Sequence, residues 1–222
     1  MKRKRCEMEK KTEIRSAIEE LSVLIITKSG DNMEAINIPL KPLLSFCNSV
    51  IQFLDKIGPT MAVLRQDIDQ NIKIEKLCES DPRVYSNLVE ILKKEKEDGV
   101  SKKADSCSRS ILWLTRTMDF TAALLQRLAN DTSHNMEQAI EECYVATLKP
   151  WHGWISSAAF RVALKLVPDR NTFINALSAK DEGFEFETLQ ADMATLTSFL
   201  VPVLQDIHSV LELYDLDRLK ST

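Results

Sequence analysis

Glycine and proline are scarce in this chain, with five and seven copies among 222 residues. Sandwiches and barrels need many tight turns, which those two residues usually supply, so the composition argues against such folds and favours long helices. Hydrophobic residues make up 44% and charged residues 28%, as in an ordinary globular protein. The length fits one large domain or two small ones.

Long apolar runs and paired cysteine motifs are also missing. No run of 18 apolar residues occurs, so we expect no membrane span, and any membrane contact should be peripheral. No signal-peptide pattern precedes the cysteines, and no CxxC spacing occurs. A reduced, cytosolic protein is the expectation. The five cysteines, an odd number, are Cys6, Cys47, Cys78, Cys107 and Cys143.

Charge of one sign is not in excess, because the formal net charge is only −4, which gives no support for nucleic-acid binding. The chain begins with a basic cluster, Lys2–Arg5. It could be a nuclear signal or a membrane-attracting patch, and our interpretation is a solvated, frayed terminus.

Catalytic signatures are absent as well. The sequence has no GxSxG, Walker, GxGxxG or HExxH motif. Its three histidines are far apart, and no Glu-x-x-His pair suggests a metal site on a helical bundle. A hydrolase built on His152 would need a nucleophile or metal that the sequence does not offer. We therefore expect a protein that is not an enzyme and needs neither cofactor nor metal.

Apolar residues recur with helical spacing almost throughout the chain. In the stretch 104–129 they cover nearly the whole circumference, which predicts a central, buried helix. No strand alternation or repeat interrupts the pattern, so we predict one all-α domain of about eight helices. The predicted ranges are 8–27, 39–58, 60–79, 82–92, 104–129, 135–148, 154–167, 168–176 and 187–215.

One short stretch stands apart, the His-Trp segment of residues 149–155. It places His152 between Trp151 and Trp154, two of only three tryptophans in the protein. Indole rings favour places where one end is apolar and the other wet, so the segment suits a membrane or lipid surface. Trp154 and Ile155 are the expected docking residues, with Trp151 beside them. The alternative is that Trp154 packs in the core.

Polar residues inside apolar helices are a second lead. Asp67 and Asn71 are four residues apart and share a helix face among apolar neighbours. In the central helix, Arg109, Trp113 and Arg116 follow helical spacing down one face. One interpretation is an exposed Asp67 and an Arg116 that pairs with Asp119, three residues on.

The other interpretation is a polar mouth on an apolar interior, able to hold a sugar-bearing amphiphile. Carboxylate and amide groups such as those of Asp67 and Asn71 hydrogen-bond hydroxyls. The Trp113 indole can stack on a sugar ring, and His152 can reach an amide carbonyl.

Three stretches together resemble the glycolipid transfer protein family. They are Asp67–Ile72, the run Leu112–Arg116, and Trp151–Ile155, and their order and spacing agree from about residue 38 to 215. The phrase Ala163–Arg170 looks like the plant members. The resemblance implies a two-layer helical sandwich that encloses lipid chains and leaves the head group at the surface. It assigns 1–37 to an N-terminal helix and loop and 38–222 to the domain.

The resemblance also implies roles. By position, Asp67 resembles the acidic residue that binds the ceramide amide N–H and head group, with Asn71 as its partner. Trp113 resembles the sugar platform, His152 the imidazole that holds the amide carbonyl, and Trp154 the membrane-entering tryptophan. Apolar positions expected at the chain pocket are Phe53, Leu64, Phe120, Leu148, Phe160 and Phe199.

Two departures leave the head group open. The glycolipid-binding members carry a basic residue seven after the aspartate, where this chain has Ile74; Lys73 or Lys76 lies on another face. Arg109 stands where the phosphate-binding branch has the first of two arginines, while Trp113 and Asn71 replace that branch's second arginine and its lysine. A lone arginine can still pair with phosphate.

The expected protein is therefore a cytoplasmic, monomeric carrier of sphingolipids that meets membranes transiently. Its cargo would be a glucosylceramide-like lipid, with ceramide-1-phosphate as the alternative. The competing class is an interaction or sensing module whose exposed tryptophans bind a partner protein.

Overall fold

The computed structural model describes residues 12–26, 36–57, 62–72, 74, 86–130, 135–177 and 186–221. Within them the chain is all-α, and the one extended pairing is an isolated bridge between Pro39 and Asn87. The helices are α1 (Glu13–Ile26), α2 (Leu40–Ile57), α3 (Ala62–Asn71), α6 (Leu88–Glu97), α7 (Cys107–Asn130), α8 (Met136–Thr147), α9 (Trp154–Leu164), α10 (Arg170–Leu177) and α11 (Phe186–Leu213).

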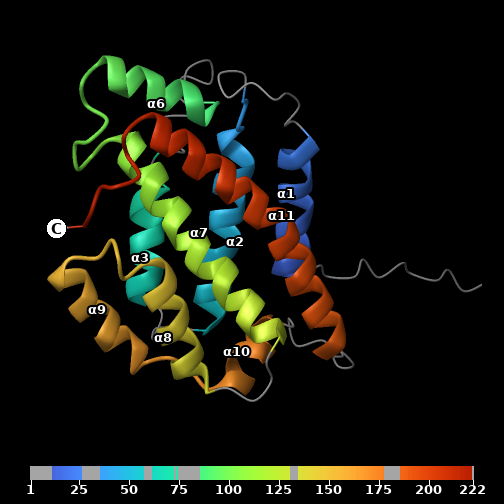
Figure 1. Cartoon of the computed structure of the whole chain (residues 1–222). Coiled ribbons are helices and arrows are strands. Elements are labelled where there is room, and N and C mark those ends of the chain that lie inside the picture. Colours follow the sequence, from blue (N-terminus) through green and yellow to red (C-terminus); the bar gives the residue numbers. More distant parts are fainter. Residues whose placement is uncertain are drawn as a thin grey trace, which may run out of the picture.

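The predicted central helix is confirmed. Helix α7 packs against α3, α6, α8 and α11, and it runs beside α11 through the middle of the molecule (Figure 1). Ile111, Leu114 and Met118 are fully buried on one face of the helix. Leu112 and Leu124, which lie on other sides of it, are buried as well. Buried apolar side chains around its circumference stabilise α7 on several faces at once.

The first helix belongs to the same body as the rest. Helix α1 packs against α2 and α11, and Ile14, Ala17 and Leu21 are buried there. The predicted start of this helix, residues 8–11, lies outside the described residues. The structure therefore joins the N-terminal helix to the helical domain through a shared core.

Glu95, in the charged stretch after residue 92, is hydrogen-bonded to the start of the central helix. Its Oε1 accepts the Cys107 N–H at 2.9 Å, and its Oε2 accepts the Ser108 N–H at 2.8 Å. The unpaired N–H groups at a helix start favour a negative charge, so Glu95 caps α7 from a neighbouring helix. Spacing along the chain gives no sign of such a long-range cap.

Asparagine side chains cap two other helices. Helix α8 is capped by Asn135, whose side chain accepts the Glu137 N–H at 3.0 Å. Helix α6 begins at Leu88 with Asn87 as its cap. The proline-led start expected at residue 82 lies outside the described residues.

Helix α11 is long and apolar enough to cross a membrane by length and composition alone. In the structure it packs against α7 and α1, with Met193, Leu200, Ile207 and Leu211 fully buried. These contacts make it a core helix of the domain.

The described cysteines are buried and form no disulfide with one another: Cys47, Cys107 and Cys143. Burial raises the pKa of Cys47 to about 12. Cys6 and Cys78 lie outside the described residues.

Candidate lipid-binding site

An apolar cavity of about 260 Å³ opens between the helices. Of the expected chain-pocket residues, Phe53, Phe120, Leu148 and Phe160 line it. Phe199 does not line it and packs against the core elsewhere. The Leu64 side chain lies outside the described part of the chain.

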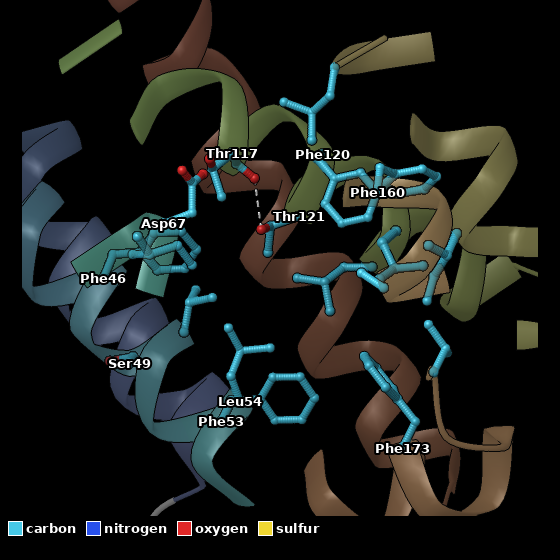
Figure 2. A pocket seen from close by; sticks show the side chains of 18 of the residues that line it. Phe46, Ser49, Phe53, Leu54, Asp67, Thr117, Phe120, Thr121, Phe160 and Phe173 are labelled. Carbon is cyan, nitrogen blue, oxygen red and sulfur yellow. Dashed lines mark hydrogen bonds between the residues drawn. The ribbon is translucent and has the colours of Figure 1, made fainter. Parts of the chain in front are cut away.

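Several helices that the sequence did not connect to the pocket supply the rest of its wall. Figure 2 shows Phe46, Phe53 and Leu54 on one side and Phe160 and Phe173 on the other. The Phe53 and Phe173 rings meet edge to face, with centroids 5.0 Å apart. The apolar stripe of α2 was visible in the sequence, but nothing there indicated that α1 and α10 face the same space. The lining residues that were not expected include Ile14, Ala17, Phe46, Val50, Leu54, Ile140, Phe173, Leu177 and Leu196.

Hydroxyl groups in the wall do not make it polar. Ser49, Thr117 and Thr121 line the cavity, and each donates to a carbonyl four residues back in its own helix, at 2.9–3.2 Å. A hydroxyl satisfied in this way presents mainly its carbon atoms to a ligand. The cavity therefore suits hydrocarbon chains along most of its length.

Asp67 stands at the mouth of the cavity, and its carboxylate turns toward α7 (Figure 2). The side chain is exposed, yet surrounding protein atoms partly desolvate it, and this burial raises its pKa. Asn71 does not line the cavity; its Nδ2 donates to the Asp67 carbonyl at 2.9 Å. Ile74 is buried, while the Lys73 side chain and Lys76 lie outside the described residues.

Trp113 and His152 line the same cavity, and their ring centroids are 5.8 Å apart. His152 Nδ1 is 3.2 Å from the Tyr144 hydroxyl. Burial and the nearby Arg116 charge lower the pKa of His152, so the imidazole is neutral at pH 7. The Tyr144 hydroxyl is also 3.3 Å from the Ser157 hydroxyl oxygen, to which it can donate its single proton. When the Tyr144 O–H turns to Nδ1 instead, the ring proton is on Nε2, which can then donate to a ligand carbonyl. No pattern in the sequence indicated Tyr144.

The interpretation that paired Arg116 with Asp119 and left Asp67 exposed is confirmed for Asp67. It is wrong for Arg116, whose hydrogen bonds go to main-chain carbonyls, although burial lowers its pKa and the Asp119 charge partly offsets this. Its guanidinium is 4.9 Å from the Trp113 ring centre and 4.1 Å from that of Trp151. It donates to the Asp217 and Leu219 carbonyls at 2.6 and 2.7 Å.

Arg116 is only 1% exposed, and this burial affects its pKa. Burial lowers its pKa to about 10, which leaves the cation protonated at pH 7. Asp119 instead contacts His208, with Oδ2 and Nε2 2.7 Å apart.

Arg109 is likewise directed away from the cavity. Its Nη2 donates to the Lys220 carbonyl at 3.2 Å, and the residue does not line the cavity. Both arginines of α7 that the sequence placed near the site thus hold the C-terminal residues. The described lining of the cavity contains no arginine or lysine.

The tryptophans of the His-Trp segment have different surroundings. Trp151 is half-buried on Arg116, whereas Trp154 is 81% exposed at the first position of α9. The core alternative for Trp154 is therefore wrong. Ile155 and Val162 are also exposed, so part of α9 presents apolar side chains to solvent.

Comparisons with known proteins agree with this geometry. A family model described as glycolipid transfer protein matches residues 38–179. The chain is 65% identical over 234 residues to glycolipid transfer protein 3 of Arabidopsis thaliana, and the match covers all of both chains.

Solved structures show the same fold at lower identity. One, which concerns how FAPP2 selects simple glycosphingolipids using the GLTP-fold, has a TM-score of 0.82 and 23% identity, covering 96% of this chain and 100% of the other. A mutant of Arabidopsis accelerated-cell-death 11 complexed with ceramide-1-phosphate has a TM-score of 0.79 and 19% identity, covering 94% and 98%.

Proposed function

We propose that this chain, which belongs to the glycolipid transfer protein family, carries single sphingolipid molecules between membranes and prefers a glycosylated ceramide. The observation that carries the proposal is an open apolar cavity whose mouth joins Asp67, Trp113 and His152. The relatives named above support the lipid-carrier class, and the choice of cargo rests on the mouth.

Hydrocarbon chains in the cavity would supply most of the binding free energy. Burial is worth about 0.8 kcal/mol for each CH₂ group. The wall offers aromatic and aliphatic carbon from helices on both sides, and the hydroxyls of Thr117 and Thr121 are already bonded within their own helix. This interior does not distinguish head groups, so selectivity must come from the mouth.

At the mouth, three groups match three parts of a glycosylated ceramide. The Asp67 carboxylate can accept from the amide N–H and a sugar hydroxyl, and His152 Nε2 can donate to the amide carbonyl. The Trp113 indole offers a flat face to the sugar. A diacylglycerol lipid has no amide, so it would cover Asp67 and His152 without supplying partners, which costs about 1–3 kcal/mol for each group that the bound lipid buries.

The direction of the arginines favours a sugar over a phosphate. A phosphate needs positive donors aimed at it, best supplied by bidentate arginine. Arg109 and Arg116 instead donate hydrogen bonds to the carbonyls of residues 217, 219 and 220. Asn71 is neutral where the phosphate-binding branch would have lysine. Ceramide-1-phosphate is nevertheless the alternative cargo that the experiment must include.

Membrane docking would involve the exposed start of α9. Trp154 and Ile155 offer an indole and an aliphatic group that are favoured in the head-group region of a bilayer. The protein would work as a cytoplasmic monomer that touches membranes briefly. Such transport needs no covalent step.

A vesicle-to-vesicle transfer assay tests the proposal. Donor vesicles would carry glucosylceramide, ceramide-1-phosphate or monogalactosyldiacylglycerol in the same phosphatidylcholine background. We expect fastest transfer of glucosylceramide and almost none of the diacyl lipid. Faster transfer of ceramide-1-phosphate would establish the alternative. No transfer of any lipid, together with no lipid after purification, would favour an interaction module.

A further inference from the structure

The last described residues, 217–221, form a C-terminal strap that crosses the His-Trp segment. At its end, the Ser221 N–H donates to the Trp151 carbonyl at 2.9 Å. The Ser221 hydroxyl accepts the Gly153 N–H at 2.8 Å. One residue thus hydrogen-bonds the main chain on both sides of His152.

The strap is itself anchored to the central helix. Arg116 donates to the Asp217 and Leu219 carbonyls, and Arg109 donates to the Lys220 carbonyl. Because the Arg116 guanidinium is buried and charged, these bonds are stronger than exposed ones between neutral groups. Ser221 is therefore held in place from α7 while it holds the segment that carries His152.

The main chain at His152 depends on this support. Residues 152 and 153 lie between helices α8 and α9, and Gly153 is extended, with φ −73° and ψ −175°. The His152 N–H donates to the Leu148 carbonyl at 3.2 Å, which ties the segment to α8. On the other side, the Gly153 N–H is satisfied by Ser221.

Ser221 also lies one contact away from the cavity. Its hydroxyl oxygen is 3.0 Å from the hydroxyl oxygen of Ser156, a residue that lines the cavity. A movement of Ser221 would therefore displace Ser156 in the cavity lining as well as the main chain beside His152.

We propose that Ser221 is a positioning residue that sets the direction of His152 and thereby the preference for lipids with an amide. The inference rests on the proposed function, since it concerns how that same site recognises its cargo. Tyr144 fixes one ring nitrogen of His152 from α8, and Ser221 fixes the main chain from the opposite side. Both supports are needed to aim Nε2 at a carbonyl.

Three substitutions of Ser221 remove its two hydrogen-bonding groups, the hydroxyl and the N–H, to different extents. Ser221→Ala removes the hydroxyl but keeps the N–H, Ser221→Pro removes both, and Ser221→Thr keeps both. The measured quantity is the ratio of glucosylceramide transfer to monogalactosyldiacylglycerol transfer. We expect this ratio to fall about three- to tenfold in Ser221→Ala, further in Ser221→Pro, and little in Ser221→Thr. Ser209→Ala is the control, because the Ser209 hydroxyl only bonds the Gln205 carbonyl within α11.

A double substitution separates positioning from general loosening. If Ser221 acts through His152, adding Ser221→Ala to His152→Ala should change the ratio little beyond His152→Ala alone. Additive losses, or an unchanged ratio in Ser221→Pro, would overturn the inference. These results differ from failure of the proposed function, in which the wild-type protein itself would show no preference for glucosylceramide.

Discussion

The two walls of the cavity mouth are built differently. On the α3 side, Asp67 is exposed, and Asn71 donates a hydrogen bond only within its own helix. On the α7 side, Trp113 and Trp151 enclose the buried Arg116, which also holds the C-terminal strap. The first wall is a helix surface, and the second is a connected network.

The contrast separates recognition from stability. A change in the α3 wall removes a ligand contact but disturbs few protein contacts, so the fold should survive. A change in the α7 wall removes contacts that bind three distant parts of the chain together. We therefore expect substitutions of similar size to act on lipid binding in one wall and on both properties in the other.

Arg116→Met should give the largest loss of stability and is the strongest test of the α7 wall. Methionine fills much of the space but leaves the Asp217 and Leu219 carbonyls without their donors. We expect a loss of about 2–4 kcal/mol, the range for a broken buried network. This corresponds to roughly 5–15 °C in melting temperature for a protein of this size.

Thermal unfolding of Arg116→Met should be measured beside Arg218→Met, whose side chain is 91% exposed in the wild type. The control should melt like the wild-type protein. If Arg116→Met also does so, the network does not stabilise the fold and the contrast between the walls disappears.

Asp67→Val should have the largest effect on binding with an intact fold. The raised pKa of Asp67 means that its charged form is desolvated at neutral pH. The fold should therefore lose little when the carboxylate is removed. Loss of a charged acceptor should weaken sphingolipid binding by about 1.5–3 kcal/mol, or roughly 10- to 150-fold.

Binding to glucosylceramide vesicles and thermal unfolding together check this result. Asp69→Val is the matched control, because Asp69 is exposed on the same helix and does not line the cavity. Normal transfer by a well-folded Asp67→Val protein would remove Asp67 from the site.

Local chemistry explains which parts of these walls could be predicted. Helix positions follow from apolar spacing, and Asp67, Trp113 and His152 stand out as polar or aromatic residues in unusual sequence contexts. All three line the same cavity. Their proposed roles toward a lipid came from the resemblance and stay predictions.

The rest depended on contacts between distant residues. Glu95 as the cap of α7, Tyr144 behind His152 and the strap on Arg116 join elements that sequence spacing cannot bring together. The expected Arg116–Asp119 pair failed for this reason, since helical spacing identifies near neighbours but not a competing carbonyl about one hundred residues away. Phe199 similarly has a suitable side chain but lies outside the cavity lining.

Trp113→Arg combined with Asn71→Lys should change head-group preference by about tenfold or more. It places one positive charge on each wall, where the phosphate-binding branch of the family would have them. Charge-assisted hydrogen bonds to phosphate should favour ceramide-1-phosphate, while loss of the indole should weaken glucosylceramide binding. Trp113→Phe is the control, because it keeps an aromatic face without adding charge.

Competition between the two lipids in one transfer assay measures the change in preference. A double variant that still prefers glucosylceramide would show that the walls do not decide the head group. A wild-type protein that already prefers ceramide-1-phosphate would reverse the leading proposal.

Trp154→Ala should have the smallest effect on the fold and a moderate effect on transfer. Trp154 is 81% exposed and lies outside the α7 wall, three residues after the half-buried Trp151. A buried tryptophan would cost about 3–5 kcal/mol when truncated, whereas an exposed one should leave the melting temperature nearly unchanged. Loss of its insertion into the head-group region should weaken vesicle binding and slow transfer severalfold. Val23→Ala, another exposed apolar residue on α1, should leave both unchanged. Early melting of Trp154→Ala, or transfer at the full wild-type rate, would refute the docking role.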